Sequence, residues 1–175
     1  TIRVGETIFI SALPHPDGKL VLVGSGAMQF LSCETELRDF VRGHGLESSV
    51  LFVGNVNNVN EYLRASDFFV FPSESEAMPL ALIEALATGL PALASDIGGV
   101  RDIIADGING RLLPVNGAAA WAKGLAEMVE RPDAARELGV RGRETVLARF
   151  GIPHVADEHL RLFARLCASG KEPSL

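Results

Sequence analysis

The sequence feature that most constrains the fold is an alternation of short apolar runs with helix-like segments between Lys19 and Leu113. Runs such as Lys19–Val23 and Phe68–Phe71 are rich in β-branched or aromatic residues and stop at Gly or Pro, which predicts strands. Strands that alternate with helices indicate βαβ units and a parallel sheet. The wholly apolar run Phe68–Phe71 is typical of a strand covered on both faces. The predicted fold is therefore α/β, a doubly wound, Rossmann-like parallel sheet followed by C-terminal helices.

The same reasoning places each element along the chain. Apolar runs bounded by turn residues predict strands at residues 19–23, 50–53, 68–71, 91–94 and 110–113. Helical spacing and its punctuation by Gly and Pro predict helices at residues 6–13, 34–44, 60–65, 80–87, 100–105, 118–130, from 132 toward 150, and from 153 to about 167. We expect a single domain over residues 1–168 and a disordered tail over residues 169–175.

Composition excludes several classes of protein. A chain of 175 residues with a net charge of −6 has neither the length for several large domains nor the basic face of a nucleic-acid-binding protein. Cys33 and Cys167 lack the spacing of a disulfide framework or a metal site, so a reducing cytoplasm is the expected location and no metal is expected. No apolar run is long enough to span a membrane. The opening residues TIRVGETIFIS contain no Met, and we expect the chain to be a piece of a longer protein.

Three loops follow strand ends, and ligands in open parallel sheets bind beyond the carboxyl ends of the strands. These loops are Gly24-Ser25-Gly26, residues 54–58 and residues 72–79. A further turn, with Asp96 and the pair Gly98-Gly99, either borders the same cleft or is an ordinary helix start. The three loops are therefore where chemistry is expected.

The third loop leads into the helix LALIEALA, which is apolar nearly all round and should be buried. A carboxylate in such a helix is costly without partners, and Glu84 lies about 40° around the helix from Leu80, on the side that the preceding loop approaches. Glu76 lies in that loop. Pro79 suits the first helical position, which leaves amide donors free to hold an anion. Two carboxylates beside such donors suit a ligand with both hydroxyls and phosphates.

Plainer interpretations remain open on the residues alone. Glu84 is equally well a solvated residue at a helix edge, and Glu76 a charge favoured by the helix dipole. NAD binding is disfavoured because Gln29 stands where a dinucleotide fingerprint has its third glycine, and no GxxxxGK[ST] phosphate loop is present.

From about Lys19 to Phe150 the chain resembles the C-terminal, donor-binding domain of the retaining GT-B glycosyltransferases known as group 1. The resemblance is carried by landmarks in matching order, namely LVLVGSG, VLFVGNV, YLRASDFFVFPS, the pair Glu76 and Glu84 with seven residues between them, EALATGLPALASDIGG and IIADGINGRLLP. It implies transfer of a sugar from a nucleotide diphosphate sugar to an acceptor hydroxyl, with no cofactor and no obligatory metal.

The resemblance also implies roles for individual residues. Glu76 would contact donor-sugar hydroxyls, and Glu84 the ribose. Backbone amides at Ala77, Met78, Leu80 and Ala81 would hold sugar and phosphate. The base and the lining of the cleft would involve Asn55, Val56 and Asn58 together with Gly24, Ser25 and Gly26.

The chain departs from the family pattern at two points. Ala77 stands where a Gly is usual. The strand that precedes the first helix in the family, with an Arg and a Lys for the diphosphate, has no counterpart, and neither does the N-terminal acceptor-binding domain. We therefore expect the domain to lack its first strand and the fragment to be inactive alone, with peripheral membrane contact left open for the full enzyme. The alternatives are a non-catalytic nucleotide-sugar-binding module and a sugar-phosphate epimerase domain of related fold.

Overall fold

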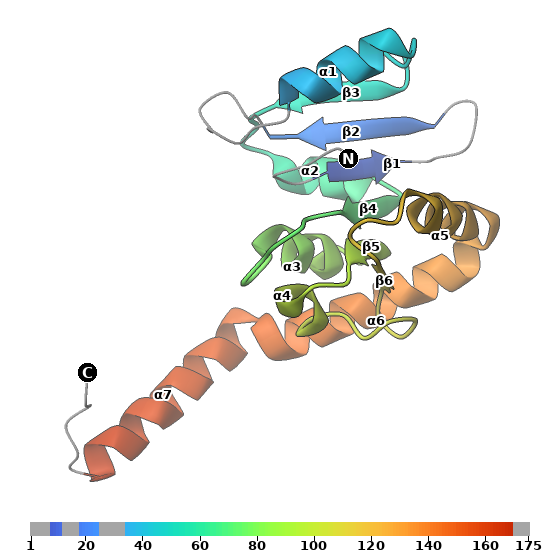
Figure 1. The fold of residues 1–175 in the computed structure, drawn as a ribbon. Coiled ribbons are helices and arrows are strands. Elements are labelled where there is room, and N and C mark those ends of the chain that lie inside the picture. Colours follow the sequence, from blue (N-terminus) through green and yellow to red (C-terminus); the bar gives the residue numbers. More distant parts are fainter. Residues whose placement is uncertain (1–7, 12–17, 25–33, 170–175) are drawn as a thin grey trace.

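A computed structural model describes residues 8–11, 18–24 and 34–169 of the chain. These residues form a six-stranded sheet in the order β3-β2-β1-β4-β5-β6, with helices packed around it (Figure 1). The strands are β1 Ile8–Ser11, β2 Lys19–Val23, β3 Val50–Gly54, β4 Phe68–Phe71, β5 Ala92–Ser95 and β6 Arg111–Leu113. The helices are α1 Glu34–Gly43, α2 Val59–Ala65, α3 Leu80–Ala87, α4 Gly98–Arg101, α5 Ala118–Glu130, α6 Pro132–Phe150 and α7 Ile152–Ser169. The expected α/β fold is confirmed.

The largest correction concerns residues 6–13, where a helix was expected. Residues Ile8–Ser11 form β1, which lies between β2 and β4 and runs antiparallel to both. The other strand pairs are parallel, so the sheet is mixed rather than parallel throughout. The sequence IFIS is short, apolar and rich in β-branched and aromatic residues, and periodicity cannot assign such a run. Pairing on both sides, which satisfies the backbone groups of β2 and β4, is a tertiary effect.

Strand β4 shows why the sheet is covered on both faces. Phe69 and Phe71 belong to one buried cluster, with side chains from α2, α3 and α6. Phe68 and Val70 belong to a second cluster, with side chains from α1 and α5. Successive side chains of a strand point to opposite faces, so the continuous apolar run that predicted a doubly covered strand is explained.

Helix α3 is held in place by α6. A Cβ atom added at Gly142 would lie 2.6 Å from Cδ2 of Leu86, so the two helices meet at a glycine. Arg143 donates a hydrogen bond to the carbonyl oxygen of Ala87, at the end of α3. The position of α3 relative to the sheet is therefore fixed along its buried side.

The remaining helices differ little from expectation. Helix α4 covers Gly98–Arg101 rather than residues 100–105, because the chain turns away after Asp102. Helix α7 continues through Ser169, and Figure 1 shows it projecting from the body of the domain. Residues 170–175 of the expected tail lie outside the described residues.

Candidate functional site

The cleft begins where β2 and β3 end side by side. Gly24 (φ 121°) and Gly54 (φ 74°) adopt left-handed backbone conformations that residues with a side chain rarely take. The amide of Gly24 donates to the carbonyl oxygen of Gly54 at 2.9 Å, which joins the two turns. Gly54 is the last residue of β3, and Asn55 and Val56 follow it directly.

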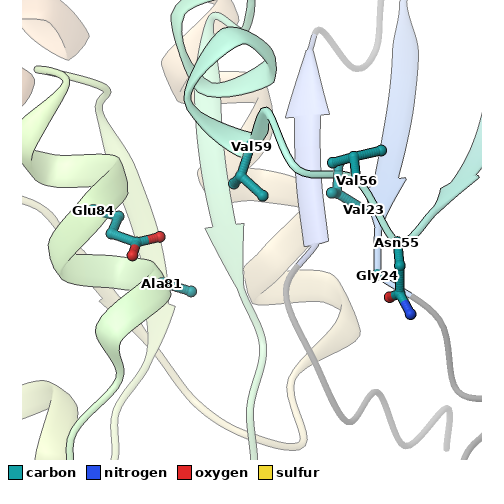
Figure 2. Close-up of a pocket in the computed structure, with 7 residues that line it drawn as sticks. All are labelled: Val23, Gly24, Asn55, Val56, Val59, Ala81 and Glu84. Atoms are coloured by element: carbon teal, nitrogen blue, oxygen red, sulfur yellow. The ribbon is translucent and has the colours of Figure 1, made fainter.

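A cavity of about 290 Å³ lies at this edge of the sheet. Figure 2 shows Ala81 and Glu84 of α3 facing Val59 of α2, with the ends of β2 and β3 on the opposite side. The described residues that line this cavity are Val23, Gly24, Asn55, Val56, Val59, Ala81 and Glu84. None of these residues is basic. Glu84 and Asn55 are the polar side chains of this lining, and they lie on opposite sides of the cavity (Figure 2).

Glu84 is exposed, as in the solvated position that the sequence left open, whereas the expected burial of the whole helix is wrong. Leu82, Ala85 and Leu86 are fully buried, whereas Leu80 keeps 63% of its surface exposed. The helix is therefore covered along one side only, and Glu84 projects from the open side. A carboxylate in contact with solvent pays little desolvation, so it needs no protein partner in this position.

The first turn of α3 offers two backbone donors. The carbonyl oxygen of Pro79 accepts from the amides of Leu82 and Ile83, at 3.1 and 3.2 Å. The amides of Leu80 and Ala81 have no acceptor among the residues that the structure describes. Free amides at a helix start attract anions, so this end of α3 can hold a phosphate or a sugar oxygen.

Glu76 lies in the loop before α3, where Ser73 Oγ donates to its Oε1 at 3.0 Å. Ala77 and Met78, the next two residues of the loop, are exposed. Glu76 does not line the cavity that contains Glu84, and neither do Ala77, Met78 and Leu80. The structure therefore does not bring Glu76 and the loop residues together with Glu84 in one cavity.

The cavity thus brings together five of the residues predicted from the sequence, Gly24, Asn55, Val56, Ala81 and Glu84. Asn58 does not line it, and its side chain donates to Glu61 Oε2 at 2.6 Å. Ser25 and Gly26 lie outside the described residues. Val59 was missed, although its spacing of three residues from Val56, in an otherwise polar Asn-rich stretch, could have indicated a shared apolar wall.

A second cavity, of about 510 Å³, continues the site between α2 and α3. It shares Val59 and Glu84 with the first cavity, and its other lining residues are Asn57, Asn60, Leu63, Ala87 and Thr88. Glu84 therefore lies at the junction of the two cavities and can be reached from both.

The turn after β5 carries the clearest electrostatic pair near the site. Arg101 Nε donates to Asp96 Oδ1 at 2.5 Å, across the start of α4. This hydrogen bond, aided by the charge of the guanidinium, lowers the pKa of the Asp96 carboxyl and raises the pKa of Arg101. The pair ties the two ends of this turn together at the protein surface.

No group of three His, Cys, Asp or Glu side chains among the described residues is placed to hold a metal ion. No helix in the described part of the chain is long and apolar enough to cross a membrane.

A sheet with a cleft at the carboxyl ends of its parallel strands, lined by a carboxylate and a helix start, defines a Rossmann-like ligand-binding domain. The family described as "Glycosyl transferases group 1" matches residues 5–145. The chain belongs to this family of glycosyltransferases, whose solved members share its GT-B-type fold.

Three similar proteins illustrate how much of a relative the chain covers. It is 30% identical over 163 residues to N-acetyl-alpha-D-glucosaminyl L-malate synthase of Bacillus anthracis, a match that covers 92% of this chain and 42% of that protein. The C-terminal domain of a glycosyl transferase group 1 family protein (LpcC) from Francisella tularensis is 25% identical, with a TM-score of 0.72 over 79% of this chain and 73% of that one. Anabaena Alr3699/HepE in complex with UDP-glucose shares the fold at 21% identity, with a TM-score of 0.81 over 87% of this chain and 42% of that one. The chain thus spans less than half the length of the Bacillus relative and corresponds to a C-terminal domain.

Proposed function

We propose that this chain is the donor-binding domain of a cytoplasmic glycosyltransferase that moves a sugar from a nucleotide diphosphate sugar to an acceptor hydroxyl with retention of configuration. The observation that supports this most directly is the position of Glu84, exposed at the junction of two cavities, one turn from the free amides of Leu80 and Ala81. A carboxylate accepts hydrogen bonds from hydroxyls, and free amides donate hydrogen bonds to an anion. A ribose followed by a diphosphate presents both groups in sequence.

In this proposal Glu84 positions the ribose and Glu76 the donor sugar, and neither acts as a general base. The amides at the start of α3 donate hydrogen bonds that stabilise the negative charge that develops on the leaving diphosphate. Val56 and Val59 provide an apolar wall for the base. The reaction uses no cofactor or obligatory metal beyond the donor itself.

We further propose that the acceptor site lies in an N-terminal domain, and that the basic groups for the diphosphate lie on the strand that precedes the first helix of the donor-binding domain in the family. Two observations support this division. The chain covers 42% of the length of the Bacillus relative, and none of the described lining residues of the first cavity is Lys or Arg. The 175-residue chain alone should therefore bind a donor nucleotide without transferring its sugar.

A calorimetric titration of the 175-residue chain with UDP, GDP and ADP, which differ in the base, tests the proposal. We expect saturable binding of at least one nucleoside diphosphate. A chain that binds none of the three, while remaining folded by circular dichroism, would contradict the donor-site assignment.

A second candidate, a non-catalytic nucleotide-sugar-binding module, is favoured by the same lack of basic lining residues. It is separated from the first by a transfer assay on a chain extended to the full length of the relatives. Release of the nucleoside diphosphate together with a glycosylated acceptor supports the enzyme, whereas donor binding without turnover in the extended protein supports the module.

A further inference from the structure

Gly99, the second residue of α4, lies against the backbone of the loop that carries Glu76. A Cβ atom added at Gly99 would lie 2.6 Å from the carbonyl oxygen of Glu76 and 2.8 Å from the carbonyl carbon of Ala77, and closer still to the Ala77 oxygen. Real Cβ atoms essentially never approach other atoms this closely. The φ angle of Gly99 is not in the left-handed region, so the requirement for glycine at this position is steric.

The neighbouring Gly98 provides a contrast. It is exposed, and a Cβ atom added there would meet nothing within 4 Å. Its φ angle is likewise outside the left-handed region. Of these two adjacent glycines, therefore, only Gly99 is buried against the Glu76–Ala77 backbone.

Helix α4 cannot retreat to make room for a side chain at Gly99. Val100, the next residue, is fully buried in the cluster that includes α3. The ion pair between Asp96 and Arg101, at 2.5 Å, joins the residues on either side of this turn. A methyl group at residue 99 would therefore press on the loop rather than move α4.

The loop is the partner that can yield. Among the described residues, the hydrogen bonds of residues 73–78 are those from Ser73 Oγ to Ser75 O and to Glu76 Oε1, both within the loop. Glu84, in contrast, is carried by α3, which α6 holds through Gly142 and Arg143. Pressure from residue 99 would thus displace Glu76 and leave Glu84 in place.

We propose that Gly99 is a positioning residue for the donor sugar, because its bare backbone sets where the Glu76–Ala77 segment lies relative to α3. Gly99 does not touch the ligand in this proposal. It acts through the carboxylate of Glu76 and the amide of Ala77. The inference rests on the proposed function and adds to it a division of the site, in which the sugar half depends on α4 and the nucleotide half does not.

The test compares the wild-type chain with Gly99→Ala and Gly98→Ala by calorimetry, with UDP, GDP and ADP each measured beside its glucose conjugate. For the pair that the wild-type chain binds, we expect Gly99→Ala to keep the affinity for the nucleoside diphosphate within about twofold. Its affinity for the glucose conjugate should fall about tenfold, which is the size of one lost hydrogen bond to a charged group. Gly98→Ala should leave both affinities unchanged.

Amide chemical shifts give a readout that does not depend on a ligand. Gly99→Ala should shift the resonances of Glu76, Ala77 and Met78 and leave that of Glu84 in place, whereas Gly98→Ala should change only its own turn. A folded Gly99→Ala variant with an unmoved loop, or with equal losses for both ligands, overturns the inference. A Gly99→Ala chain that does not fold also overturns it, because the loop would then be part of the core. A wild-type chain that binds no nucleotide would instead refute the proposed function itself.

Discussion

Gly139 of α6 lies directly against the carbonyl group of Gly89, in the turn that ends α3. A Cβ atom added at Gly139 would lie 3.1 Å from the Gly89 carbonyl carbon and closer to its oxygen, and 3.0 Å from the nitrogen of Pro91. Because both neighbours are backbone atoms, neither can rotate away as a side chain would. The close approach of α6 to the end of α3 therefore depends on the lack of a side chain at this position.

We predict that Gly139→Ala lowers the free energy of unfolding by about 1–3 kcal/mol, the usual effect of overpacking a rigid contact. Urea denaturation followed by circular dichroism measures this change. Gly43→Ala is a matched control, because Gly43 is the last residue of α1 and a Cβ atom added there would meet nothing within 4 Å. An unchanged midpoint for Gly139→Ala would show that the contact is looser than described.

Replacement of Glu84 tests its proposed role toward the ribose. We expect Glu84→Ala to weaken nucleoside diphosphate binding by about 1–3 kcal/mol, because a hydrogen bond to a charged group is lost. A nucleotide that lacks the ribose 2′- or 3′-hydroxyl should bind the wild-type chain more weakly by a similar free energy. For the Glu84→Ala variant, removal of that hydroxyl should weaken binding little further, since both changes remove the same interaction. Calorimetry measures the four affinities.

Glu137→Ala, which removes an exposed carboxylate of α6 that lines neither cavity, is the control for charge. Fully additive losses in the Glu84 cycle would assign the ribose to another residue.

Asn109 is a buried polar residue that joins the turn after α4 to α6. Its Oδ1 accepts from the amide of Ala105 at 2.7 Å, and its Nδ2 donates to Ile103 O at 3.0 Å and to Thr145 Oγ1 at 3.2 Å. We predict that Asn109→Ala lowers the free energy of unfolding by about 2–3 kcal/mol, since the buried carbonyl of Ile103 and the amide of Ala105 lose their side-chain partner.

Thr145→Val removes only one of these bonds and should have a smaller effect, and exposed Asn60→Ala should have almost none. Thermal unfolding of the three variants gives the ranking. Equal melting temperatures for Asn109→Ala and Asn60→Ala would contradict the described network.

The ion pair between Asp96 and Arg101 predicts a pH dependence in the acid range. The hydrogen bond from Arg101 lowers the pKa of Asp96 in the folded chain. The stabilising contribution is therefore present above the unfolded pKa of about 3.9 and is lost as the pH falls through the folded value. We expect the Asp96 carboxyl to titrate below its ordinary range by NMR and Arg101→Gln to return it toward that range. A titration curve that Arg101→Gln does not move would contradict the pairing.

Much of the fold could be predicted because local pattern and burial agree. The run Phe68–Phe71 is apolar at every position, and it forms a strand with one pair of side chains in each of two cores. Glycines at the ends of β2 and β3 could be predicted to end those strands, and Gly24 and Gly54 do so in left-handed conformations. The predicted ends of β2 and β3 also indicated where the cavity with Gly24 and Asn55 lies.

Three features could not be predicted, because each depends on contacts between distant segments. Residues 8–11 form a strand since β2 and β4 flank them. The choice between a buried and an exposed Glu84, which the sequence left open, depends on the burial of α3 only along the side that faces β4, β5 and α6. The difference between Gly98 and Gly99 depends on the loop of Glu76, more than twenty residues earlier in the chain.

The sequence by itself thus determined the α/β class, the order of most elements and the residues that meet at the strand ends, because hydrophobic periodicity and turn residues act over a few neighbouring positions. Only the tertiary structure decided which carboxylate faces the cavity, which strand fills the middle of the sheet and which glycine supports the loop of Glu76. Those outcomes depend on how side chains pack against backbone across the fold. Close packing joins residues that are distant in the sequence, and a local pattern contains no information about such contacts.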